Sequence, residues 1–253
     1  MNRTIPILLG GIAALVLSGS AMAADSSKLS GALKKYAIGV QDAQVANATE
    51  IASNLLAVNP ANDSLVWSAD KTKVKVVTWK SQNSYNNNLA PYTQTSGNEA
   101  FVVWVTMAPR IQEFCRNYLA SHPNATQADL ETRLKQRLGL HPSWQYDVFV
   151  EMWVDPADIF RPCVDPDPSD SACELNFGST IPTVKNIKDY GAFYKNLYYG
   201  SFRTAPGVPW TGLGYTYDWN RRASEQGESE FILSPQTPYV IEQAVPTLQY
   251  CAP

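Results

Sequence analysis

The sequence is poor in the residues on which many hydrolytic sites depend. It contains only two histidines, His122 and His141, and each precedes a proline, where a helix-capping role is ordinary. No G-x-S-x-G motif occurs, and Gly200-Ser201 lacks the trailing glycine, so no serine nucleophile of that type is indicated. Two histidines cannot by themselves fill a catalytic zinc site that needs three protein ligands. These absences argue against nucleophilic and metal-assisted hydrolysis.

The motifs of several other function classes are also missing. There is no P-loop and no dinucleotide-binding fingerprint, so nucleotide chemistry is not expected. The formal charge is −3, and the two basic stretches at residues 71–75 and 133–137 look like solvated faces, which argues against nucleic acid as a partner. The CxxC and HxxxH spacings of zinc sites are absent. We therefore predict no metal and no cofactor.

The first twenty-three residues have the order of a secretory signal peptide. Arg3 supplies an early positive charge, residues 5–17 are almost wholly apolar, and Ala21-Met22-Ala23 places small residues before a cut. We predict cleavage after Ala23 and export to a periplasmic or extracellular compartment. Cleavage would remove one arginine and no acid, which takes the formal charge to −4. The remaining chain, 24–253, has no apolar run long enough to span a membrane.

The four cysteines predict disulfides, because an even number in an exported chain is typical of an oxidising compartment. Three pairings are open, and we favour Cys163–Cys173 with Cys115–Cys251. The first pair brackets a polar, proline-rich stretch that reads as a loop. That stretch, residues 165–176, lacks the glycine and the glutamate of an EF-hand, so we expect a stapled loop and not a calcium site.

Three N-x-S/T triplets occur in the predicted mature chain, at Asn47, Asn62 and Asn124. They matter only in a host that glycosylates asparagine. The signal is bacterial in style, so we expect these sites to be unused.

Hydrophobic periodicity predicts one α+β domain with a mostly antiparallel sheet of about 4–6 strands, flanked by helices and stapled by two disulfides. Residues 24–60 are a candidate for a loosely packed N-terminal helical arm. The remaining pattern predicts helices at 41–58, from Pro109, after Thr126 and at 184–199; strands at 64–68, 73–80, 99–107, 146–154 and 230–233; a long loop at 82–98; and an extended edge segment at 237–250.

Three of the predicted strands carry one tryptophan each on the face opposite their more aliphatic side. If these strands are neighbours, Trp79, Trp104 and Trp153 share a face with Glu151 among them. Such a face is either an aromatic platform for a sugar or a peptide, or a core surface covered by helices.

Glu151 is the sharpest catalytic candidate, because a carboxylate between Phe149 and Trp153 is the type of group that acts as a general acid. Asp218 is the candidate second carboxylate for glycoside chemistry, with Asp155 and Asp158 as further options. The alternative is that Glu151 points to solvent or pairs with an arginine such as Arg110 or Arg161.

Residues 209–219 concentrate aromatic side chains among glycines. This stretch predicts a ligand groove, in which Asp218 hydrogen-bonds the ligand beside Trp210, Tyr215, Tyr217 and Trp219. The alternative is an irregular segment that closes the core.

The overall prediction is an exported binding or interaction protein of the cell envelope, whose partner is a glycan, a peptide or an envelope protein. The alternative is a glycan-directed hydrolase that uses Glu151 and Asp218.

Overall fold

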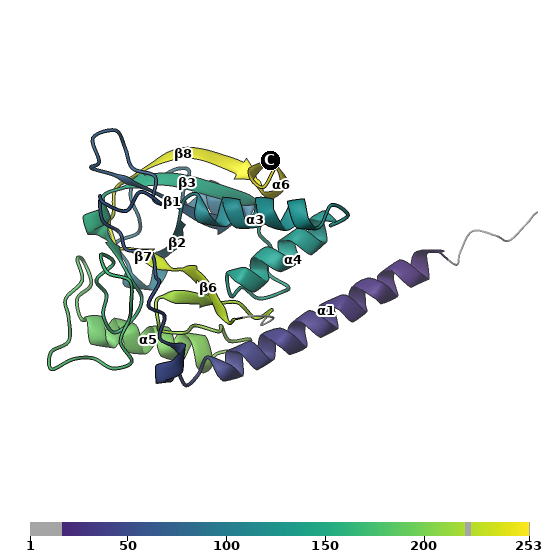
Figure 1. Ribbon diagram of the computed structural model, residues 1–253, viewed down its shortest axis with the longest axis horizontal. Helices are drawn as coiled ribbons and strands as arrows, with labels where there is room; N and C mark the ends of the chain where they lie inside the picture. Colours follow the sequence, from purple (N-terminus) through teal and green to yellow (C-terminus); the bar gives the residue numbers. More distant parts are fainter. Residues whose placement is uncertain (1–16, 221–223, 253) are drawn as a thin grey trace, which may run out of the picture.

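A six-stranded antiparallel sheet forms the centre of the fold, with helices packed against it, and a two-stranded sheet lies beside it (Figure 1). The computed structural model describes residues 17–220 and 224–252, with side chains from Ser27 onward. The strand order is β4-β7-β2-β1-β3-β8, and β5 pairs with β6. The strands are β1 Val74–Lys80, β2 Val103–Met107, β3 Val148–Val154, β4 Ile159–Phe160, β5 Tyr215–Tyr217, β6 Gln226–Ser229, β7 Phe231–Leu233 and β8 Tyr239–Pro246. The predicted fold class is confirmed.

The α-helices are α1 Leu17–Asp42, α2 Gln82–Asn88, α3 Arg110–Ser121, α4 Gln127–Arg137, α5 Tyr190–Phe202 and α6 Thr247–Tyr250. Short 3₁₀ turns occupy Ala48–Glu50, Glu99–Phe101 and Pro156–Asp158. Helix α4 follows the predicted signals: Thr126 accepts a hydrogen bond from the backbone N–H of Asp129, and Gly139 follows the helix with a φ of 67°. The predictions for α3 and α4 are therefore confirmed.

The two faces of the central sheet bury different kinds of residue. One face is aliphatic, with Val76, Val150 and Met152 fully buried under irregular segments that include Val58 and Leu65. On the other face, α3 and α4 cover Trp79 and Phe149. Residues of α5 pack near Trp104 on this same face. The sheet is thus covered on one face by two separate groups of helices.

The registers place the three predicted tryptophans on that second face. Lys75 pairs with Trp153 and Val77 with Glu151, while Trp79 lies opposite Phe149. Val77 also pairs with Thr106, which puts Trp104 on the same side. The shared face is confirmed. It is not an open platform, because Trp79 and Glu151 are buried and helices cover the face.

Both disulfides are the favoured ones, with Cα–Cα separations of 5.4 Å for Cys115–Cys251 and 6.3 Å for Cys163–Cys173. The first joins α3 to the end of the chain. The second closes a loop that is organised by the fully buried Arg161, which donates hydrogen bonds to the carboxylate of Asp170 and to several backbone carbonyls. The charge of Arg161 is therefore compensated within a structural loop, and Arg161 is not a partner of Glu151.

The predicted helix at 41–58 is wrong. Helix α1 ends at Asp42, and Asn47 begins only a 3₁₀ turn, with Glu50 closing a capping box. The chain then runs extended beside the disulfide loop, where the N–H groups of Leu55 and Val58 donate to the carbonyls of Ser171 and Pro168. Tertiary hydrogen bonds have replaced the helical ones, because local helix preference is weak against packing.

Other boundaries differ from the expectations in smaller ways. The predicted loop at 82–98 begins with helix α2, whose N-terminus is capped by Ser81. Residues 64–68 form a single bridge, Trp67 to Val74, instead of a full strand. Residues 239–246 form an edge strand as predicted, and α6 follows it.

The predicted signal peptide, residues 1–23, falls mainly on residues outside those that the structure describes, and residues 17–23 belong to α1. This helix projects from the rest of the molecule at its N-terminal end (Figure 1). Its C-terminal half is attached to the domain through Tyr36, which packs against Tyr217 and Trp219 and donates a hydrogen bond to the carbonyl of Gly207.

Candidate functional site

The central sheet opens between strands β1 and β2. Every residue of β1 from Val74 to Lys80 pairs with β3, but only Val76 and Val77 pair with β2. The earlier residues of β2, from Val103 to Val105, pair with β7 instead. The two strands therefore diverge beyond Val77, and the space between them is not filled by a backbone ladder.

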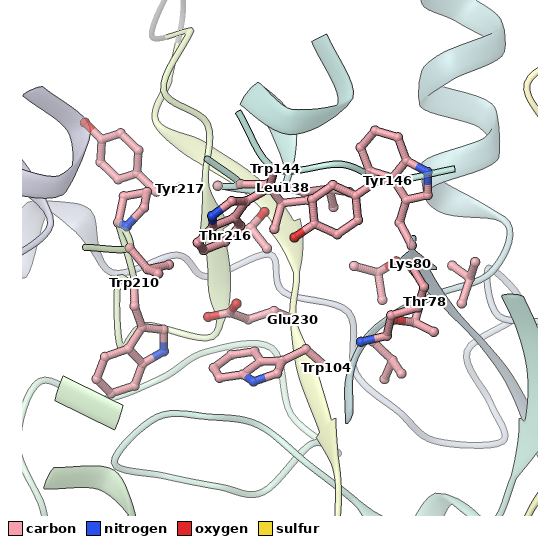
Figure 2. A pocket seen from close by; sticks show the side chains of 18 of the residues that line it. Thr78, Lys80, Trp104, Leu138, Trp144, Tyr146, Trp210, Thr216, Tyr217 and Glu230 are labelled. Atoms are coloured by element: carbon pink, nitrogen blue, oxygen red, sulfur yellow. The ribbon is translucent and has the colours of Figure 1, made fainter. Parts of the chain in front are cut away.

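A cavity of about 320 Å³ occupies this opening and the space between the two groups of helices (Figure 2). Its volume is at the lower end of the range for small-molecule sites in proteins. Strands β1 and β2 form one wall, and the segments that follow α4 and α5 form the others. Its aromatic lining residues are Trp79, Trp104, Trp144, Tyr146, Phe149, Trp210 and Tyr217.

One carboxylate, Glu230, lies in this lining. It immediately precedes β7, and its backbone N–H donates to the carbonyl of Gly214. Its side chain is buried, and the Oε1 atom has no hydrogen-bond partner among the described residues. Burial disfavours the charged form and raises the pKa of Glu230 from its ordinary 4.5 to about 8. At neutral pH the cavity therefore holds a mostly protonated acid.

Gly214 fixes the position of the Glu230 backbone. It has a φ of 76°, which L side chains rarely adopt, and a Cβ at this position would collide with Arg161 and with the sulfur of Cys173. The glycine-containing stretch thus allows its carbonyl to reach Glu230 beside the disulfide loop.

Three further polar groups belong to the same lining as Glu230. The indole Nε1 of Trp210 is buried and, like Oε1 of Glu230, has no partner in the described part of the chain. Lys80 is half-buried, and the loss of water around its amine lowers the pKa of this group. Burial raises the pKa of Tyr146 to about 12, so its hydroxyl stays protonated. Figure 2 shows Glu230 with its carboxylate toward the side where Trp210 lies, and Lys80 on the opposite side.

The sequence-predicted carboxylates lie outside this cavity lining. Glu151 accepts hydrogen bonds from Gln243 at 2.8 Å and Tyr250 at 3.1 Å, and the amine of Lys75 lies 3.7 Å away. It therefore pairs with a lysine and not with either predicted arginine.

Asp218 is held by the guanidinium of Arg133, whose two nitrogens lie 3.0 and 2.6 Å from its carboxylate oxygens. This bidentate pair is of the strong, charge-assisted type. Glu151 and Asp218 thus have different partners on different elements, and both carboxylates are already engaged in ion pairs.

The sequence-predicted aromatic residues do not form an exposed surface. Trp210, Tyr215, Tyr217 and Trp219 are 5%, 2%, 2% and 1% exposed. Trp210 and Tyr217 line the cavity. Tyr215 donates to the carbonyl of Glu50 and Trp219 to that of Leu140, so these two belong to the core. A role in binding stays a prediction for all four.

Sequence reasoning missed Glu230, Lys80, Trp104 and Trp144 as residues of one site. The signal available was the position of Glu230, an acid next to the apolar run Phe231–Leu233 that forms β7. A buried strand seldom begins with an unpaired acid, because burying a charge is costly. The opening between β1 and β2 could not be predicted, because no sequence pattern indicates where two strands stop pairing.

A separate group of acids could meet the ligand preference of a hard cation. Within the described residues, the carboxylates of Asp42, Glu50 and Glu225 all lie within 4.8 Å of one another and are half-buried. Asp42 also accepts a hydrogen bond from the hydroxyl of Tyr217. Acidic side chains gather in this way without an ion, and we assign no metal to them.

None of the helices in the described part of the chain combines the length and the apolar character that crossing a bilayer demands. Comparisons with protein-family models, with curated proteins and with solved structures found no match to this chain.

Proposed function

We propose that this chain is an exported binding protein that holds a small ligand in the aromatic cavity between β1 and β2. The observation that carries the proposal is the buried Glu230 in a cavity of about 320 Å³, where its Oε1 atom has no hydrogen-bond partner among the residues that the structure describes. Buried polar groups in proteins are almost always paired, so an unpaired one in a cavity points to a partner that binds there.

The aromatic lining supports a ligand with a flat or apolar body. Large aromatic side chains bury much ligand area, and a few placed polar groups then fix the orientation. Export is supported by the order of residues 1–23 and by two disulfides, which persist in oxidising compartments. The partner that we propose is therefore a small molecule, in place of the glycan polymer, peptide or envelope protein that an open aromatic surface would bind.

The alternative of a glycan-directed hydrolase gains no support. Its two candidate carboxylates are held in ion pairs, and Glu230 is the one carboxylate among the described residues that line the cavity. Glycoside hydrolysis usually requires a pair of carboxylates that flank one bond.

Trp144 offers a direct test, because it lines the cavity and is also 37% exposed, which places it where a ligand enters. The mature protein is screened against a metabolite collection by thermal shift, and hits are measured by calorimetry. We expect saturable 1:1 binding of at least one compound, which Trp144→Ala weakens about tenfold or more.

Trp153→Ala is the matched control, because Trp153 is also partly exposed but lies outside the cavity lining, with the Lys75 amine over its ring. Binding should be unchanged in this variant. Absence of saturable binding, or equal losses in the two variants, overturns the proposal.

A further inference from the structure

Among the described residues, the cavity lining contains one acidic and one basic side chain, and these two do not form an ion pair with each other. Its titratable lining residues are Lys80, Tyr146, Tyr217 and Glu230. Glu230 and Lys80 have no ion pair in the described structure, either with each other or with another side chain. Elsewhere near the sheet, by contrast, the buried acids Glu151 and Asp218 have basic partners. Glu230 and Lys80 therefore differ from these paired side chains, and one ligand that contacts both groups would explain the difference.

The two groups enter the cavity from opposite sides. Glu230 precedes β7, while Lys80 ends β1, and the opening between β1 and β2 separates them. Figure 2 shows Lys80 with Thr78 on one side and Glu230 with Trp210 on the other, and the Trp104 ring lies below Glu230. A ligand that bridges this space meets an acid at one end and an amine at the other.

We propose that the cavity binds a small ring compound with a cationic nitrogen at one end and an anionic group at the other. The nitrogen binds Glu230 and the anionic group binds Lys80. This inference rests on the proposed function and names the ligand class for the same site.

Each part of the lining has a role in this arrangement. The cationic nitrogen donates to Oε1 of Glu230, an acceptor that no described residue satisfies. It lies beside the Trp104 and Trp210 rings, whose faces attract cations. Lys80 donates to the anionic group. The aromatic walls stack on the ring and exclude water, which strengthens both charge contacts. A ligand with only one charge leaves the opposite protein group without a partner.

The pKa directions of Glu230 and Lys80 agree with this ligand class. Burial raises the pKa of Glu230 and lowers that of Lys80, so both groups are driven toward their neutral forms. A cationic nitrogen restores the charged form of Glu230. Binding of a cation near pH 7 should therefore release a proton from Glu230, and this release can be measured by calorimetry in buffers of different ionisation enthalpy.

The test uses four probes that share one benzene ring: 4-(aminomethyl)benzoate, benzylamine, benzoate and benzyl alcohol. Calorimetry on the mature protein at pH 7 should show 4-(aminomethyl)benzoate binding at least about tenfold more tightly than each single-charge probe. Glu230→Gln should remove its advantage over benzoate and abolish the proton release with benzylamine. Lys80→Met should remove its advantage over benzylamine. Benzyl alcohol should bind weakly and equally to both variants.

Glu113→Gln and Lys73→Met are the matched charge controls, because both residues are exposed and outside the cavity lining. They should leave all four affinities unchanged, and circular dichroism checks that every variant is folded. If the probes bind equally well with or without charge, and Trp144→Ala weakens them all, the cavity function stands and the two-charge inference is overturned. If no probe and no metabolite binds, both proposals fail.

Discussion

Strand β1 lies between β3 and β2, and the buried acids on these two sides have different surroundings. On the β3 side, pairing continues along the whole strand, and the buried Glu151 has hydrogen bonds from Gln243 and Tyr250. On the β2 side, pairing stops after Val77, and one oxygen of the buried Glu230 has no hydrogen-bond partner within the described ranges. A buried acid that has hydrogen-bond and ionic partners within the fold stabilises the fold. An acid beside an opening in the sheet remains available to a ligand.

The largest expected effect that tests this comparison is the pH dependence of stability at Glu230. Its folded pKa of about 8 lies above its ordinary 4.5, so the folded protein keeps a proton that the unfolded chain loses between these values. This contribution to the free energy of unfolding is full below pH 4.5 and falls as the pH rises to 8, by up to roughly 5 kcal/mol at 1.36 kcal/mol per pKa unit.

Glu230→Gln cannot titrate and should lose this dependence. We expect its urea-unfolding free energy to change less between pH 5 and 8 than that of the unchanged protein, and to exceed it at pH 8. Glu113→Gln, an exposed acid, should keep the original slope. Parallel curves for Glu230→Gln and the unchanged protein would show that Glu230 is already ionised or partnered in the fold.

The next effect concerns Asp218, the other sequence-predicted carboxylate that is already paired. Arg133→Met removes the bidentate partner. The buried carboxylate then keeps the backbone N–H of Asn220 and, as its remaining basic neighbour in the described structure, Arg137, whose nearest nitrogen is 4.0 Å away. We expect a loss of about 3 kcal/mol in unfolding free energy, measured by urea titration, because an uncompensated buried charge is costly.

The double variant Arg133→Met, Asp218→Asn removes the charge as well and should recover part of this loss. Ligand affinity at the cavity should be unchanged in any folded variant of the pair. A loss below about 0.5 kcal/mol for Arg133→Met, typical of a surface ion pair, would contradict the interpretation of Asp218 and Arg133 as a buried pair that stabilises the fold.

The smallest effect distinguishes Trp219 from Trp210. The indole N–H of Trp219 donates to the carbonyl of Leu140, whereas that of Trp210 has no partner in the described structure. Trp219→Phe should therefore destabilise the protein by about 0.5–1.5 kcal/mol more than Trp210→Phe, since it removes a hydrogen bond of the fold. Thermal unfolding measures the difference. Trp210→Phe should instead weaken ligand binding. If Trp210→Phe destabilises the protein more and Trp219→Phe weakens binding more, the two assignments are wrong.

Much of the fold follows from local signals in the sequence. The Thr126 cap and Gly139 mark the two ends of α4, and the alternation in residues 146–154 identifies β3. The spacing of Cys163 and Cys173 around a proline-rich loop indicates their bridge. These signals succeed because each depends on residues close together in the chain.

The predictions fail where distant segments supply the partners. Residues 51–58 have helical spacing, but their N–H groups bond to the disulfide loop more than 100 residues away. Likewise, the position of Glu151 between two aromatic residues predicted a general acid. Its partners in the fold, Gln243, Tyr250 and Lys75, come from other segments and hold it in a structural role.

Residue spacing and chemistry in the chain thus set the class of fold, the disulfides and the shared face of Trp79, Trp104 and Trp153. The folded arrangement decided which acid remained unpaired. Strand pairing and side-chain partners join segments far apart in the chain, and the free energy of a buried charge depends on these partners. Glu151 and Asp218 each have a basic partner, whereas Oε1 of Glu230, in the cavity, has no partner among the described residues.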